Sequence, residues 1–176
     1  MKIFIGIDTG TTHTKAVACN EEAVVLSEYK ETNTTYHSVE DAAEQDAEEI
    51  FQNVLSVIKK TVEQIKSTDE IVFISFSSAM HGIMAVDHKG IPLALIMTWA
   101  DKRSKKIAAE LLSGDKGKQL WLQTGTPVHA MTPLCKIKWI KENQPGIFKR
   151  AHKFIGIKEY IFFKLFNKYI IDYSVA

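Results

Sequence analysis

The sequence predicts an α/β fold in which a mixed β-sheet is flanked by helices. Three short β-rich segments come first, separated by turn residues. A long segment with helical apolar spacing follows, and then another apolar run of strand length. A Rossmann unit would instead alternate strand and helix from its start. The 176 residues, 45% of them hydrophobic, are enough to bury a core and are close to the length of one domain.

The first three predicted strands form an antiparallel meander. They span Lys2–Asp8, His13–Cys19 and Val24–Glu31, and the stretches "TGTT" and "NEE" between them suit tight turns. A long helix is expected next. Ser38 and Asp41 resemble a capping box at its start, and apolar residues keep approximately helical spacing up to Lys66.

The rest of the chain is predicted to be strand-rich at first and then helical. "EIVFISFSS" (70–78) predicts a buried strand, and "GIMAVDHKG" (82–90) and "PLALIMTW" (92–99) predict two more strands around a "DHKG" turn. Arg103–Leu112 is predicted to be a helix, and the remainder is predicted to be mostly helical. The sequence contains no internal repeat and no linker-like stretch.

Composition argues against several classes of function. The formal net charge is only +1, and the basic residues that accumulate after residue 130 indicate solvated helix faces rather than a nucleic-acid site. The apolar start is too short for a signal peptide, and no apolar run approaches the roughly 20 residues of a membrane span. Cys19 and Cys135 lack metal-ligand spacing and predict free thiols. We therefore expect a cytoplasmic enzyme or binding domain with no nucleic-acid or membrane partner.

The stretch "IGIDTGTTHTKA" (5–16) places a lone carboxylate, Asp8, before a turn of small residues. Such a turn leaves backbone N–H groups free for phosphate oxygens, which makes four residues candidate phosphate ligands: Thr9, Gly10, Thr11 and Thr12. Asp8 would hold Mg²⁺ through water, because this ion keeps several of its waters. Lys15 would add a positive charge to the same site. The alternative is an ordinary hairpin turn capped by Asp8.

Three stretches together resemble the FGGY carbohydrate kinases. The turn just described is similar to the first phosphate-binding segment of the actin-like ATPase superfamily. "ISFSSAMHGIMAVDHKGIPLALIMTWADKRS" (74–104) is similar to the family's Met-His-Gly element, hairpin and Trp-x-Asp-x-Arg motif. Residues 124–176, from "TGTPVHAMTPLCKIKW" to "DYSVA", are similar to its Thr-Gly, Lys-x-x-Trp and Asp-x-Ser-x-Ala patterns. The resemblance covers essentially the whole chain.

This resemblance implies a ribonuclease H-like (actin-like ATPase) fold and an enzyme that transfers the γ-phosphoryl group of ATP, with Mg²⁺, to a hydroxyl of a sugar or sugar acid. It also implies that residues 1–176 are most of the N-terminal domain. The rest of that domain, the proton-accepting Asp and a C-terminal nucleotide domain are then expected after Ala176. We therefore assign no catalytic base here and expect this fragment alone to be inactive; the resemblance allows a homodimer of the full-length enzyme.

Within the family, "SSAMHG" and "TWADKRS" are most similar to gluconate kinases and next to xylulose kinases. The Asn-Gln-Arg-Glu element of glycerol kinases is missing, which argues against glycerol as the substrate. Two other classes of function stay open. A resolvase-like nuclease would need more carboxylates around Asp8 for two metal ions. A non-catalytic sugar-binding or nucleotide-binding module would keep the first phosphate turn.

Six residues are candidate sugar contacts by this resemblance: Met80, His81, Gly82, Asp101, Arg103 and Met131. His81 would donate to a sugar hydroxyl beside an apolar wall made by Met80, or be a half-buried histidine at a strand end. Arg103 would bind the carboxylate of a sugar acid, or form an internal salt bridge with Asp101. Asp172 is explained as well by a role as a cap or turn residue as by a role as an active-site carboxylate.

Overall fold

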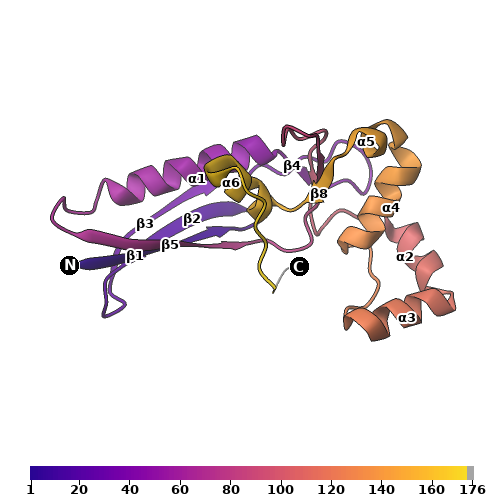
Figure 1. Cartoon of the computed structure of the whole chain (residues 1–176), viewed down its shortest axis with the longest axis horizontal. Coiled ribbons are helices and arrows are strands. Elements are labelled where there is room, and N and C mark those ends of the chain that lie inside the picture. The colour runs from indigo at the N-terminus through magenta and orange to yellow at the C-terminus, as the bar shows by residue number, and fades with distance from the viewer. Residues whose placement is uncertain (174–176) are drawn as a thin grey trace. The chain divides into compact units, whose positions relative to one another are not determined.

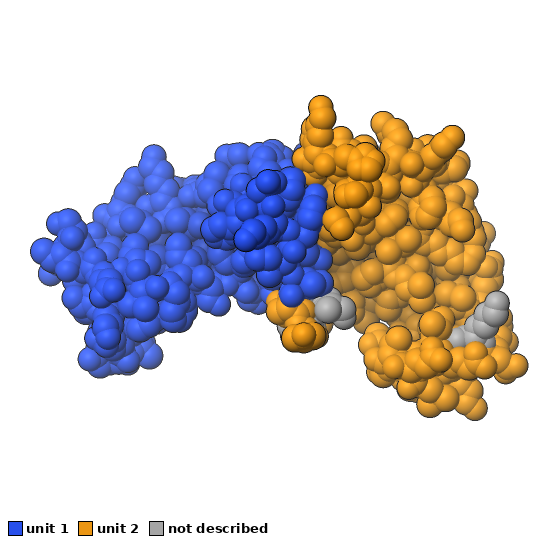
Figure 2. Space-filling model, viewed as in Figure 1, with its two compact units in different colours: residues 1–35, 46–79, 157–171 blue, residues 36–45, 80–156, 172–176 orange. Residues whose placement is uncertain are grey.

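The computed structural model describes residues 1–173 and divides the chain into two compact units (Figure 1 and Figure 2). Unit 1 contains Met1–Thr35, Asp46–Ala79 and Ile157–Ile171. Unit 2 contains Tyr36–Gln45, Met80–Gly156 and, at the end of the described residues, 172–173. Each unit is thus built from segments that are far apart in the sequence, which explains why no linker-like stretch is seen.

Unit 1 is organised around a four-stranded sheet with the order β3-β2-β1-β5. Its strands are β1 (Lys2–Thr9), β2 (His13–Cys19), β3 (Val25–Thr32) and β5 (Glu70–Ser78). The first three pair antiparallel, and β5 pairs parallel to β1. The predicted meander and the mixed sheet are therefore confirmed. A strand over 70–78 is also confirmed, but the prediction that it is buried is wrong: it lies at the edge of the described sheet, and none of its residues is buried.

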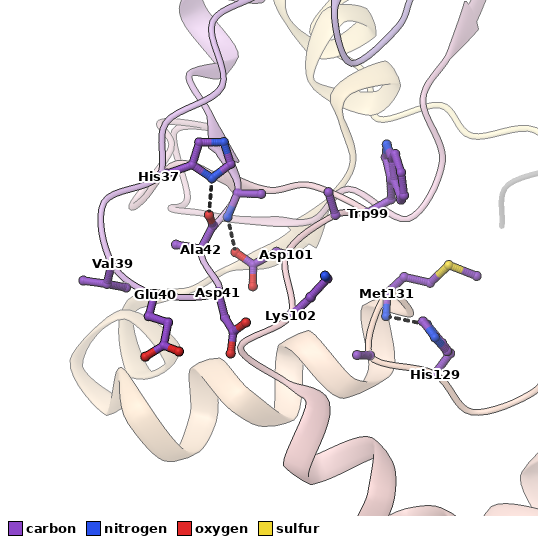
Figure 3. Close-up of a pocket in the computed structure, with 13 residues that line it drawn as sticks. His37, Val39, Glu40, Asp41, Ala42, Trp99, Asp101, Lys102, His129 and Met131 are labelled. Atoms are coloured by element: carbon purple, nitrogen blue, oxygen red, sulfur yellow. Dashed lines mark hydrogen bonds between the residues drawn. The ribbon is translucent and has the colours of Figure 1, made fainter.

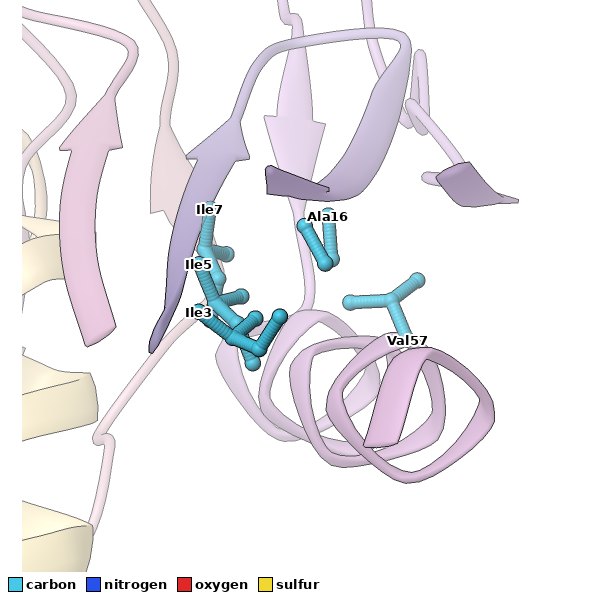
Figure 4. Close-up of a cluster of buried hydrophobic side chains, with 6 residues drawn as sticks. Ile3, Ile5, Ile7, Ala16 and Val57 are labelled. Atoms are coloured by element: carbon cyan, nitrogen blue, oxygen red, sulfur yellow. The ribbon is translucent and has the colours of Figure 1, made fainter. Parts of the chain in front are cut away.

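The core of unit 1 lies on one face of this sheet. Alternation along β1 buries Ile3, Ile5 and Ile7, which cluster with Ala16 of β2 and Val57 of helix α1 (Ala47–Val62) (Figure 4). The intervening residues of β1 point to the opposite face, because successive side chains of a strand alternate. Asp8 is therefore exposed on the face that does not carry this core.

The edge strand β5 is unusually apolar on its surface. Four successive residues are 37–52% exposed: Ile71, Val72, Phe73 and Ile74. The strand has β1 on one side and no further strand on the other among the residues that the structure describes. Helix α6 (Ile157–Phe166) packs near the end of β5, where Phe76 contacts Phe162 edge to face.

The predicted helix start at Ser38 is wrong. Helix α1 begins at Ala47, after Asp46, whose carboxylate accepts hydrogen bonds from the backbone N–H groups of the first helical turn. Upstream, Asp41 has a φ of 65°, which an α-helix cannot contain. The segment then forms β4 (Glu44–Gln45), which pairs with β7 (Ile96–Met97) in unit 2.

Unit 2 combines short strands with helices. Its remaining elements are β6 (Met84–Val86), α2 (Lys105–Leu112), α3 (Asp115–Thr124), α4 (Pro133–Asn143), α5 (Pro145–Arg150) and β8 (Lys153–Ile155). The strands predicted over 82–90 and 92–99 are thus much shorter than expected. The predicted helix over 103–112 and the helical remainder are confirmed, whereas β8, which pairs with β6, was not predicted. None of the described helices has the length and apolar character needed to cross a bilayer.

Candidate functional site

The predicted phosphate turn joins β1 to β2 in unit 1. Asp8 is in register opposite Lys15 and lines a hollow of about 300 Å³ with backbone and side chains of β1, β2 and β5. Its carboxylate has no hydrogen-bond or ion-pair partner among residues 1–173. Gly10 closes the turn, and a Cβ there would lie 3.2 Å from the carbonyl oxygen of His13 and 3.5 Å from Oδ2 of Asp8. A glycine therefore leaves the space beside the carboxylate open.

The surroundings of Asp8 fit a hydrated Mg²⁺ better than a metal held by many protein ligands. No group of three or more His, Cys, Asp or Glu side chains within the described part of the chain could hold a metal ion. A lone carboxylate suits Mg²⁺, which keeps most of its waters. It does not suit the two-metal arrangement that a nuclease would need here.

Asn33 holds the turn in place, and sequence reasoning missed it. This residue is 4% exposed; its Nδ2 donates to the carbonyl oxygen of Gly10 at 2.8 Å, and its backbone N–H donates to that of Thr12 at 2.9 Å. Thr9 is also buried, and its hydroxyl donates to the carbonyl oxygen of Ser77 at 3.1 Å. The N–H of Gly10 donates to His13, so Gly10 would supply space for a phosphate rather than a donor.

Lys15 has a partner within its own sheet. Its Nζ lies 2.8 Å from Oε1 of Glu28, and both side chains are about half exposed. Ion pairs of this kind contribute only about 0–1 kcal/mol. The ammonium group can therefore exchange Glu28 for a phosphate at little cost, and its predicted role remains open to test.

Unit 2 contains a larger hollow, of about 660 Å³, which is within the range of small-molecule sites (Figure 3). It is lined by residues from three segments: 37 and 39–43, 99–102, and 129–131. Asp101 and Met131, both predicted sugar contacts, are brought together here with Trp99 and Lys102. Met80, His81, Gly82 and Arg103 do not line this hollow.

Arg103 is held by two carboxylates. Its Nη2 lies 2.7 Å from Oδ2 of Asp101 and 2.6 Å from Oε1 of Glu44, and its Nε also donates to Asp101. The guanidinium lies over the ring of Trp139, and its side chain is 8% exposed. Burial lowers the pKa of Arg103, but its hydrogen bonds and charge contacts with Asp101 and Glu44 outweigh burial and raise it. The salt-bridge interpretation is confirmed, and Glu44 is a partner that the sequence did not reveal.

The Met80-His81-Gly82 corner has a constrained backbone. His81 has a φ of 64°, in the left-handed region that is costly for a non-glycine residue. A Cβ on Gly82 would lie 3.3 Å from Cγ2 of Ile96. Burial, together with the positive charges of Lys136 and His129, lowers the pKa of His81. A neutral His81 ring can both donate to and accept from sugar hydroxyls.

Lys136 of α4 lies behind this corner. It is 0% exposed, and its Nζ donates to the carbonyl oxygens of His81 and Thr98, both at 2.7 Å. The sequence contained it only as part of the Lys-x-x-Trp pattern. Of the Asp-x-Ser-x-Ala pattern, Asp172 is exposed, and Ser174 and Ala176 lie outside the described residues.

We expect Lys136 to lose its proton at a lower pH than an ordinary lysine. Burial lowers its pKa to about 8; the charge of Arg103 acts in the same direction, and the carboxylate of Asp101 acts against it. A proton-detected NMR titration of the lysine side chains in the full-length protein should show one resonance that changes near pH 8. That resonance should be missing in Lys136→Met. A lysine spectrum in which every resonance titrates above pH 10 would contradict this.

The comparisons with known proteins agree with one another. The model of the FGGY family of carbohydrate kinases, N-terminal domain, matches residues 3–176. The gluconokinase of Bacillus subtilis (strain 168) is 45% identical over 172 residues, which are 98% of this chain and 33% of that protein. The crystal structure of gluconate kinase from Lactobacillus acidophilus matches with a TM-score of 0.94 at 32% identity, over 99% of this chain and 35% of that one.

Ligand-bound xylulose kinase from Lactobacillus acidophilus matches equally well, with a TM-score of 0.95 at 32% identity over the same shares of the two chains. The chain therefore spans about a third of the length of these relatives. The family model, by contrast, covers nearly all of the chain. The resemblance seen in the motifs is confirmed, and the chain belongs to the N-terminal domain of the FGGY family of carbohydrate kinases.

Proposed function

We propose that the protein to which this chain belongs transfers the γ-phosphoryl group of ATP to a hydroxyl of gluconate. The observation that carries this proposal is the 45% identity to a gluconokinase along 98% of the chain. We also propose that residues 1–176 are most of the N-terminal domain. The remainder of that domain and a nucleotide domain would follow in the full-length protein.

The two hollows would bind different reactants, phosphate with Mg²⁺ in unit 1 and the sugar in unit 2. In unit 1, Asp8 would hold Mg²⁺ through water, and the turn after it would receive phosphate oxygens. When bound, Mg²⁺ neutralises charge on the phosphoryl group. In unit 2, the hollow lined by Trp99 and Met131 would hold the sugar chain against apolar surface. The proton acceptor for the attacking hydroxyl is assigned to none of residues 1–173.

Recognition of a sugar acid requires a cation near its carboxylate, because a buried carboxylate without a partner is costly. Arg103 was the expected cation, but two carboxylates already share its charge and it does not line the larger hollow. Lys102 does line that hollow, and its side chain has no ion-pair partner within residues 1–173. This supports Lys102 as the group that would bind the carboxylate, while a direct contact from Arg103 remains a prediction.

The full-length enzyme is expected to have a higher kcat/KM for gluconate than for xylulose. Lys102→Met should lower kcat/KM for gluconate about tenfold, the loss of roughly one charged hydrogen bond, and leave other accepted polyols nearly unchanged. Release of ADP in a coupled assay measures all of these values. Lys106→Met is a matched control, since Lys106 is exposed and does not line this hollow.

A xylulose kinase is the second candidate, because the ligand-bound xylulose kinase structure matches this chain as well as the gluconate kinase structure does. If the native enzyme prefers xylulose, the gluconate proposal is wrong and the family assignment stands. If Lys102→Met reduces phosphorylation of gluconate and of neutral polyols equally, Lys102 does not recognise the carboxylate.

A further inference from the structure

We infer that Lys136 is a positioning residue, which fixes from behind two backbone corners that carry residues predicted from the sequence to contact the sugar. One corner is Met80-His81-Gly82, and the other runs from Thr98 to Asp101. The inference rests on the proposed function only in naming sugar binding as what the corners serve. The geometry that carries it lies entirely within unit 2.

Lys136 has the donors that these corners need. An ammonium group has three N–H donors and no acceptor. Here it faces three backbone carbonyl oxygens, those of His81 and Thr98 at 2.7 Å and that of Met97 at 3.4 Å. The ammonium group thus pairs with backbone acceptors, and none of the described carboxylates forms an ion pair with Lys136.

The two corners need support at this position. Ile83 and Met97 exchange backbone hydrogen bonds of 3.1 and 2.9 Å, which ties the two segments together on one side of the corners. The other bridge between these segments, Val86 with Pro92, lies on the side away from the corners, so no strand pairing in the described part of the chain reaches the corners themselves. The left-handed conformation of His81 is intrinsically unfavourable and persists only where the surroundings impose it. The contact from Lys136 to the His81 carbonyl oxygen fixes the peptide unit that follows this residue.

A purely structural role would be better served by an apolar side chain. Burying a charge is costly, and replacing buried charged groups by hydrophobic residues of similar volume is often neutral or stabilising. Methionine would fill the same volume as Lys136 without that cost. The ammonium group is therefore best explained by the backbone geometry that it imposes. Substrate-positioning geometry is sensitive to shifts of about 1 Å, which alter rates about a hundredfold.

The test uses the full-length protein with Lys136→Met. Hydrogen exchange measured by mass spectrometry should become faster in peptides that cover residues 79–84 and 97–104. Exchange in α1 of unit 1 should not change. For the sugar that the native enzyme accepts, KM should rise about tenfold or more, with KM for ATP within about twofold of native. Lys138→Met is the matched control, because Lys138 is on the same helix and pairs with Glu142 at the surface.

Each outcome decides the question. Unchanged exchange in both peptides overturns the inference, whether or not the enzyme phosphorylates any sugar. An equal rise in KM for sugar and for ATP, with faster exchange throughout unit 2, shows a general structural role and also overturns it. If the native protein phosphorylates no sugar, the proposed function fails, and the exchange data alone decide the role of Lys136.

A second variant covers the case in which Lys136→Met does not fold. Lys136→Gln keeps two N–H donors on a shorter side chain. We expect it to fold and to raise KM for the sugar while KM for ATP stays near native. Native values of both KM and exchange in Lys136→Gln would overturn the inference.

Discussion

Asp8→Asn is expected to lower kcat of the full-length enzyme by about two to three orders of magnitude. The substitution keeps the shape of the side chain but removes the charge that would hold Mg²⁺ through water. The melting temperature should stay close to native, because Asp8 is exposed and its carboxylate makes no hydrogen bond or ion pair within residues 1–173. Turnover measured over a range of Mg²⁺ concentrations, together with thermal unfolding, checks both parts.

Glu28→Gln is the matched control for this experiment. Glu28 is a half-exposed carboxylate of the same sheet that pairs with Lys15, so its removal should change turnover little. If Asp8→Asn turns over as fast as native, the assignment of Asp8 to the metal is wrong. The turn would then be an ordinary hairpin turn, which the sequence also allowed.

Arg103→Met is expected to destabilise the protein by about 3–5 kcal/mol, the usual result of removing one partner from a buried ion pair. The substitution leaves two carboxylates without their cation, and their side chains are 0% exposed for Asp101 and 11% for Glu44. It also removes the guanidinium that packs on Trp139. Melting temperatures of the full-length variants, measured at one pH and one protein concentration, test this.

Lys105→Ala provides the comparison, because Lys105 pairs with Asp41 at the surface, where ion pairs contribute little to stability. A small shift for Arg103→Met, similar to that of Lys105→Ala, would show that the buried cluster does not stabilise the fold. If Arg103→Met instead folds normally and loses gluconate selectivity alone, the original expectation that Arg103 binds the sugar acid is correct.

Local patterns were sufficient to predict the strands of the sheet in unit 1. The β1–β3 meander follows from short apolar segments and tight turns, which are features of neighbouring residues. The helix start failed for a non-local reason. Ser38 and Asp41 match a capping box, but pairing of β4 with β7, some 50 residues away, holds that segment in another conformation. Tertiary contacts commonly override such local signals.

The sequence motifs identified candidate site residues, but they did not identify the residues that hold those side chains in place. Asp8, Asp101 and Met131 could be selected because their motifs are contiguous in sequence. Glu44 meets Arg103 across 59 positions, and Lys136 meets His81 across 55. Nothing in the local sequence around either residue indicates such a partner. A buried lysine in an amphipathic helix is also indistinguishable, by pattern alone, from one on the solvent side.

The exposed apolar strand β5 has a practical consequence for anyone who prepares residues 1–176 alone. Its run Glu70–Ser78 carries a single charge, at its first residue, and neither lysine nor proline, the residues that usually protect an edge from pairing with other molecules. Four successive apolar side chains lie beside open backbone donors and acceptors. Such a segment promotes strand addition between copies and aggregation. This edge would therefore lower the solubility of the isolated chain. A lysine introduced within residues 71–74, which line neither hollow, would improve it.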